Sequence, residues 1–173
     1  MKETINDILT RRSCKKYKPD TVSDEDIKTI VEAGLAAPTG RNRQASIMLV
    51  IKDKDTRDAL SRANARVLGA EVDPFYGAPV VIVVLAKKDV NTYLYDGSVT
   101  AENILLAAHA LGLGACWIHR AREVFETEEY KALLKSLGVT DEYEGIANCT
   151  VGYPDWDELP APLKRNDGRV FYI

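Results

Sequence analysis

The chain has 173 residues and a mass of 19.2 kDa, so we expect a single domain over residues 1–173. Its 46% hydrophobic and 28% charged residues are ordinary for a globular protein and exclude a disordered, collagenous or coiled-coil chain. The net charge of −3 argues against a general nucleic-acid-binding protein. The longest apolar run, residues 78–86, is far shorter than the roughly 20 residues that cross a bilayer, and no apolar secretion signal opens the chain. We therefore expect a cytoplasmic protein with neither a membrane nor a nucleic acid as its partner.

The first half of the chain predicts three helices and one strand. Apolar residues at helical spacing predict a helix over residues 3–12. A second helix should begin at Ser23, whose side chain can accept a hydrogen bond from the amide of Asp26. A short strand over residues 46–51 and a third helix over residues 55–67 follow.

The second half of the chain contains the most apolar segments. The β-branched run 80–85 predicts a strand buried on both faces. The motif Asp96-Gly97-Ser98 is expected to precede a long helix over residues 99–113, whose apolar part, 104–111, should lie in the core or at a subunit contact. The later elements are a strand at 115–118, a helix at 122–137, a strand at 146–151 and a proline-rich extended arm at 154–173.

The order of these elements indicates the fold class. Helices outweigh strands, and two helices precede the first strand, so the chain lacks the regular alternation of a doubly wound sheet. We therefore expect an α+β fold with a central mixed β-sheet flanked by helices.

The familiar catalytic motifs are absent. The sequence contains no P-loop, no dinucleotide fingerprint, no GxSxG elbow and no HExxH motif. Its three cysteines, Cys14, Cys116 and Cys149, are too few and too far apart for a disulfide framework or a zinc site, so no metal is expected. No side chain stands out as a catalytic acid, base or nucleophile. If the protein is an enzyme, a cofactor should carry the chemistry.

A basic cluster near the N-terminus predicts an anion site. Alternate residues of an extended segment face one side, so Arg11, Ser13 and Lys15 can face one ligand. Two cations and a hydroxyl suit a phosphate monoester. A second basic group, including Lys164 and Arg165, lies near the other end of the chain. The alternative is that the first cluster only neutralises the negative end of the preceding helix dipole.

Five segments in order resemble the nitroreductase-like flavoproteins. They are RRSCKKY at 11–17, AAPTGRNRQ at 36–44, FYGAPVVIVV at 75–84, AAHALGLGACWI at 107–118 and VGYP at 151–154. The resemblance covers essentially the whole chain. It implies a homodimer with an exchanged C-terminal arm and one FMN per subunit at the dimer interface. It also implies a ping-pong, two-electron reduction of a nitro, quinone or related small-molecule acceptor, with NADH or NADPH as hydride donor.

The resemblance also implies a set of FMN-binding residues. Arg11, Ser13 and Lys15 would hold the phosphate and ribityl chain, Arg12 would contact the region near the ring, and the backbone of β-type residues 115–117 would run beside it. The remaining residues would come from the loop that covers the partner's flavin and from the C-terminal basic pair. The full set is Arg11, Arg12, Ser13, Lys15, Pro38, Thr39, Asn42, Gln44, Ala115, Cys116, Trp117, Lys164 and Arg165.

Two departures from the family pattern limit what the resemblance implies. Lys15 stands where arginine is common, and residues 63–76 match poorly. Two alternatives therefore stay open: another flavin chemistry on the same scaffold, such as flavin fragmentation or dehalogenation, and a non-enzymatic flavin-binding or redox-sensing module.

Overall fold

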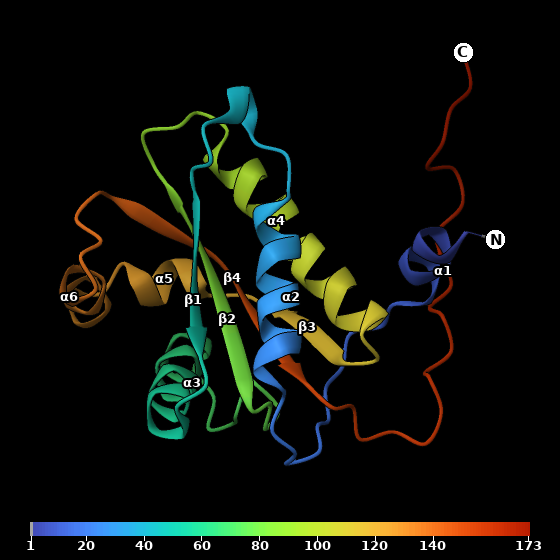
Figure 1. The fold of residues 1–173 in the computed structure, drawn as a ribbon, viewed down its shortest axis with the longest axis horizontal. Helices are drawn as coiled ribbons and strands as arrows, with labels where there is room; N and C mark the ends of the chain where they lie inside the picture. The colour runs from blue at the N-terminus through green and yellow to red at the C-terminus, as the bar shows by residue number, and fades with distance from the viewer. Residues whose placement is uncertain (1) are drawn as a thin grey trace.

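The computed structural model describes residues 2–173. Its strands form one four-stranded sheet, and Figure 1 shows helices on both faces of this sheet. The strands are β1 (Ser46–Ile51), β2 (Val80–Lys87), β3 (Gly114–Ile118) and β4 (Tyr143–Gly152). The helices are α1 (Glu3–Thr10), α2 (Asp24–Leu35), the short η1 (Gly40–Asn42), α3 (Lys54–Leu68), α4 (Tyr93–Ala110), α5 (Ala121–Phe125) and α6 (Glu128–Ser136). The predicted α+β class is confirmed.

The sheet has the order β1-β2-β4-β3, and each neighbouring pair of strands is antiparallel. Within residues 2–173, parallel pairing occurs only as an isolated bridge between Ser13 and Ala115. The sheet of one chain is therefore antiparallel, where the sequence predicted a mixed one. Among the described residues, β1 pairs only with β2 and is therefore an edge strand.

The central strand β2 is buried on both faces, as predicted. Ile82 and Val84 pack with α2 and α4 on one face, whereas Val81 and Val83 pack with α3, α5 and α6 on the other. Because side chains alternate along a strand, a continuous β-branched run serves two hydrophobic cores at once.

The two helices on the first face begin in different ways. The Ser23 hydroxyl accepts a hydrogen bond from Asp26 N at 3.0 Å, so the predicted N-cap of α2 is confirmed. α4 begins at Tyr93, six residues before the predicted start, and Gly97 lies inside it. A Cβ at Gly97 would lie 2.6 Å from Ile146 Cγ1. This glycine therefore serves close packing of the helix on β4 and does not mark a helix end.

The predicted helix over residues 122–137 is two helices, α5 and α6. The chain leaves the helical conformation at Thr127, whose hydroxyl donates to the carbonyl of Val124 at 2.7 Å. The Phe125 and Tyr130 rings pack with centroids 5.1 Å apart across this break. Both short helices are amphipathic, so the apolar pattern runs on through the turn and does not reveal it.

The C-terminal arm is extended, as predicted. After the bridge between Tyr17 and Pro154 it contains no helix or strand, and Figure 1 shows it running beside α1, with both termini on the same side of the molecule. Asp155 N donates to Lys16 O at 3.0 Å and fixes the start of the arm. None of the helices within residues 2–173 is both long and apolar enough to cross a membrane.

Candidate functional site

The segment after α1 is fixed against β3. Cys14 N donates to Ala115 O at 2.9 Å, and Ser13 forms the parallel bridge with the same residue. Gly114 permits this approach, since a Cβ there would lie 2.6 Å from Cys14 Sγ. The backbone contacts with Ala115, and not the polar side chains, therefore fix the position of this basic segment.

Arg11 has an unsatisfied hydrogen-bond donor. Its side chain is 23% exposed, and its Nη1 is buried without a hydrogen-bond partner among residues 2–173. Its Nε lies 3.9 Å from Glu102 Oε1, at the outer limit of an ion pair. Leaving a buried N–H without an acceptor costs free energy, and a bound anion would supply the acceptor that this guanidinium lacks.

The basic segment runs beside Cys116 of β3, with Ser13 and Lys15 exposed to solvent. Burial raises the pKa of Cys116, while a hydrogen bond with Ser13 and the charges of Lys15 and Arg11 act in the opposite direction. Arg11, Ser13 and Lys15 thus lie on one short segment beside β3. Because burial outweighs the two cations, the thiol stays protonated at neutral pH.

The neighbouring basic side chains face elsewhere. Lys16 is 75% exposed and pairs with Asp155 at 2.7 Å. Arg12 donates through Nε to the carbonyl of Pro160 at 3.0 Å and through Nη1 to the carbonyls of Leu9 and Arg11 at 2.9 Å. Within one chain, both residues tether the C-terminal arm.

The predicted flavin-covering loop lies apart from this cluster. Gln44 N donates to Thr39 Oγ1 at 3.1 Å, and the Gln44 side chain donates to Asn42 Oδ1 at 3.1 Å. Gly40 N donates to Asp96 Oδ1 at 3.1 Å and ties the loop to the first turn of α4. Figure 1 shows the loop at the top of the view and α1 on the right, near opposite ends of α4.

The remaining predicted residues lie in β3, beside the loop and on the C-terminal arm. Ala115 and Cys116 are buried and Trp117 is half-buried, all in β3. Pro38 is exposed beside the loop, and Lys164 and Arg165 are exposed on the arm. Neither arm cation forms an ion pair with any residue that the structure describes. The predicted set is therefore gathered at three places in one chain and not at one.

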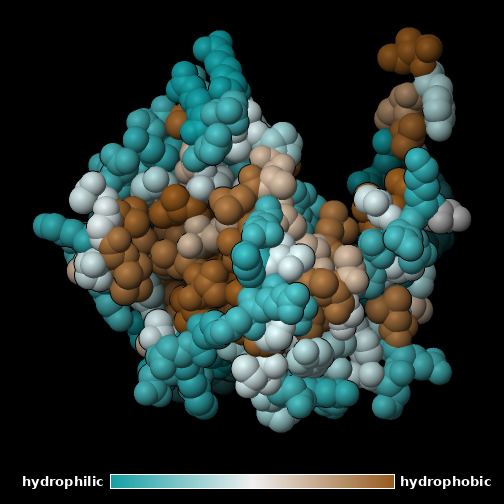
Figure 2. Space-filling view, viewed as in Figure 1, coloured by the Kyte–Doolittle hydropathy of each residue, from teal (hydrophilic) through white to brown (hydrophobic). Residues whose placement is uncertain are grey.

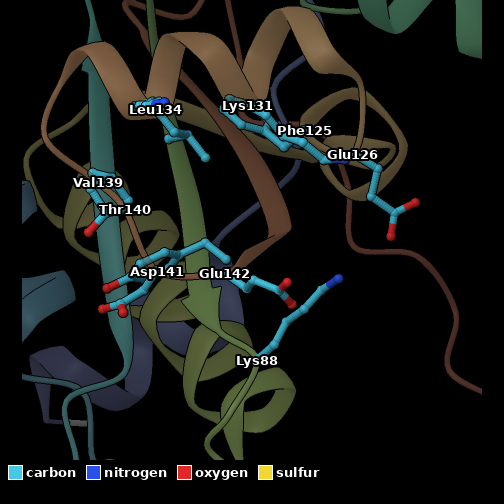
Figure 3. A pocket seen from close by; sticks show the side chains of 11 residues that line it. Lys88, Phe125, Glu126, Lys131, Leu134, Val139, Thr140, Asp141 and Glu142 are labelled. Atoms are coloured by element: carbon cyan, nitrogen blue, oxygen red, sulfur yellow. The ribbon is translucent and has the colours of Figure 1, made fainter.

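A cavity of about 450 Å³ lies away from all of these residues. Figure 3 shows it between Leu134 of α6 and the loop before β4, where Asp141 and Glu142 lie. Asp141 already pairs with Lys87 at 3.0 Å. None of the predicted site residues lines this cavity, and we assign it no role.

The poorly matching stretch 63–76 has a structural role at its end. Asp73 accepts hydrogen bonds from Ser61 Oγ at 2.6 Å, from Phe75 N at 2.9 Å and from Gly77 N at 2.7 Å, and it pairs with Arg57. Burial raises the pKa of Asp73, but these bonds together hold it below its usual value. This carboxylate fixes the turn that leads into β2.

The sequence patterns did not single out Arg41 and Arg43, although both lie inside the predicted loop. Arg41, Asn42 and Gln44 have φ values of 55°, 55° and 49°, in the left-handed region. Such backbone is uncommon for residues other than glycine and gathers at ligand-binding sites. The sequence did offer a signal for these two residues, because both cations lie among the predicted loop residues Thr39, Asn42 and Gln44.

Comparison with known proteins places the chain in a family. A protein of Archaeoglobus fulgidus, provisionally named an NADH dehydrogenase/NAD(P)H nitroreductase, is 33% identical over 158 residues, which are 89% of this chain and 87% of that protein. The NADPH-flavin oxidoreductase of Vibrio harveyi is 28% identical, with coverage of 90% of this chain and 67% of its own. A nitroreductase of Desulfitobacterium hafniense, solved with bound FMN, superposes with a TM-score of 0.86 at 27% identity, over 100% of this chain and 99% of that one.

The family model described as the nitroreductase family matches residues 8–153, which include the basic segment, the loop and all four strands. The resemblance carried by the five sequence segments is thereby confirmed. The chain belongs to the nitroreductase family.

Proposed function

We propose that the protein is an FMN-dependent NAD(P)H oxidoreductase that reduces small-molecule acceptors, such as nitro or quinone compounds, by two electrons. The observation that carries this proposal is the buried Arg11 Nη1 without an acceptor, beside Ser13 and Lys15. Bound FMN would supply the hydride chemistry, with NADH or NADPH as the donor and the small molecule as the acceptor in a ping-pong cycle. The D. hafniense nitroreductase with bound FMN and the V. harveyi NADPH-flavin oxidoreductase support the cofactor and the donor.

The residues present fit a phosphate monoester. Arg11 can supply a bidentate guanidinium, Lys15 a second positive charge and Ser13 a hydroxyl donor. β3 would hold the ring with the backbone of residues 115–117. The protonated Cys116 thiol adds no negative charge to a site that has to accept an anion.

The protein's own contribution is positioning. Hydride transfer needs donor and acceptor held in a fixed orientation and needs no general acid or base of defined pKa. The hydrogen bond from Cys14 N to Ala115 O and the bridge between Ser13 and Ala115 hold the basic segment against β3 for this purpose. No side chain is therefore assigned a catalytic role.

We propose that the active unit is a homodimer. The loop 38–44 and the arm residues Lys164 and Arg165 would then complete the site of the other subunit. Val170, Phe171 and Tyr172 at the end of the arm are 67%, 83% and 96% exposed. An apolar tail this exposed is unstable in water and calls for a partner surface.

The free edge of β1 offers such a surface. β1 pairs on one side only, and Figure 2 shows apolar surface in the region that β1 occupies in Figure 1. Val50 on this strand is 39% exposed. An extended tail that adds to an unpaired strand edge gains backbone hydrogen bonds and side-chain burial together. We propose that the tail of one subunit docks at β1 of the other, in a protein of the cytoplasm.

The test is the cofactor content and turnover of the purified protein. We expect a yellow protein with oxidised-flavin absorbance, bleached by NADH or NADPH without oxygen and restored by a nitroaromatic or quinone. The Arg11→Gln variant should lose bound FMN. A folded protein that neither retains FMN when purified nor binds added FMN would refute the proposal, and bleaching without transfer to any acceptor would favour a redox-sensing role.

A further inference from the structure

A second, smaller cleft lies beside the loop at the start of α4. It has a volume of about 220 Å³ and is lined by Gly40, Arg41, Arg43, Val90, Asn91 and Thr92. Arg41 and Arg43 are exposed, and neither forms an ion pair with any residue in 2–173. Both positive charges are therefore available to a ligand.

The carboxylate nearest in the hydrogen-bond network is already engaged. Asp96 is 4% exposed, its Oδ1 accepts from Gly40 N at 3.1 Å, and its Oδ2 accepts from Thr92 Oγ1 at 3.0 Å. Asp96 therefore holds the floor of the cleft in place. It does not form an ion pair with either arginine.

The loop also separates its residues by role. Thr39, Asn42 and Gln44 bond to one another and shape the loop from within. Arg43 N donates to Gly40 O at 3.2 Å, but the side chains of Arg41 and Arg43 form no hydrogen bond with residues 2–173. The backbone of the loop, left-handed at Arg41 and Asn42, is thus held by internal hydrogen bonds while both guanidinium groups stay exposed.

We infer that this cleft binds a phosphate group of the nicotinamide dinucleotide that donates the hydride. The inference rests on the proposed function, since the same loop is expected to cover the flavin that the dinucleotide must reach. Guanidinium groups bind phosphate bidentately, and the amide of Asn91 offers a neutral donor. The cleft is smaller than the roughly 300 Å³ at which sites for whole ligands begin, so it suits a single group of a larger molecule.

Two sources of this phosphate are possible: the 2′-phosphate, which only NADPH carries, and the pyrophosphate, which NADH and NADPH share. Arg41→Gln and Arg43→Gln each remove one charge from the cleft. Arg62→Gln is the matched control, because Arg62 is an exposed arginine of α3 that forms no ion pair with the described residues. Each variant is purified with its flavin.

Binding is measured first, without turnover, by calorimetric titration with adenosine 2′,5′-bisphosphate and with ADP. We expect each cleft variant to weaken the binding of at least one of these ligands about tenfold or more, as the loss of a charge-assisted hydrogen bond predicts. Loss with adenosine 2′,5′-bisphosphate alone identifies the 2′-phosphate, and loss with both identifies the pyrophosphate. The Arg62→Gln variant should bind both as the unchanged protein does.

Steady-state kinetics gives the second readout. The kcat/KM for NADPH alone, or for NADPH and NADH alike, should fall in parallel with the binding loss, while FMN content stays constant. If Arg41→Gln and Arg62→Gln give the same ligand affinities and the same kcat/KM, the inference is overturned. A fall in kcat/KM that is confined to a carboxylated acceptor such as 4-nitrobenzoate also overturns it. A protein that binds FMN but never oxidises NADPH or NADH would instead refute the proposed function, whatever the calorimetric result.

Discussion

Arg11→Gln should weaken FMN binding far more than Lys16→Gln, although each removes one positive charge. Arg11 is mostly buried and has an unsatisfied Nη1 donor, whereas Lys16 is 75% exposed and already bonded to Asp155. A charge-assisted hydrogen bond to phosphate is worth about 1.5–3 kcal/mol, or roughly 10- to 150-fold in dissociation constant. An exposed, paired lysine contributes about 1 kcal/mol or less, roughly fivefold at most.

The assay is titration of apoprotein with FMN, followed by quenching of flavin fluorescence at about 50 and 200 mM salt. Because a buried contact is screened little, the Arg11→Gln loss should persist at the higher salt, while any Lys16→Gln effect should shrink. Equal losses that both vanish at high salt would mean that the segment is only a diffuse positive surface. The assignment of Arg11, Ser13 and Lys15 to the phosphate would then have to be withdrawn.

Three further outcomes follow from the structure. Cys116→Ala should retain both FMN and turnover, and the thiol should react slowly with iodoacetamide at pH 8, because burial raises its pKa; a variant with FMN but no turnover would contradict this. Sedimentation at low micromolar concentration should give about twice 19.2 kDa, and deletion of residues 170–173 should shift the protein toward monomer; an FMN-loaded monomer would refute the dimer. Asp73→Asn should lower the free energy of unfolding by about 1.5–3 kcal/mol at pH 7. Because the native pKa of Asp73 is depressed, the stabilisation by its carboxylate is present above the unfolded-state pKa near 4 and is lost as pH falls through the native pKa. The urea midpoints of variant and parent should therefore converge in acid and not at high pH.

The parts of the fold that sequence predicted are those in which local chemistry and burial agree. Residues 80–84 are all β-branched and are followed by Leu85, and the structure buries all six residues. Ser23 is a helix cap because its hydroxyl reaches the Asp26 amide within a single turn. Both features need only neighbouring residues to be understood, so they can be recognised before the fold is known.

The parts that it did not predict depend on contacts between distant segments. From the sequence alone, Gly97 indicates a helix end. Its place inside α4 is explained only by the nearness of Ile146 on β4. The pairing of Lys16 with Asp155 joins residues that lie far apart in the chain. For the site, the alternation of Arg11, Ser13 and Lys15 could be predicted, but the pairing of this segment with Ala115 required β3 to be located.

The separation of the site residues within one chain is itself an argument for the dimer. The loop is tied through Gly40 to Asp96 at the first turn of α4, and the basic segment follows Thr10, whose hydroxyl shares a 2.8 Å hydrogen bond with His109 at the last turn. The thirteen-residue rise from Asp96 to His109 separates these two anchor points by about 20 Å along α4. If both segments contact the same cofactor, we expect them to come from different subunits, and a two-fold arrangement satisfies this twice with a single kind of interface. Dimerisation is then a condition for forming the site and not only a means of covering an apolar tail.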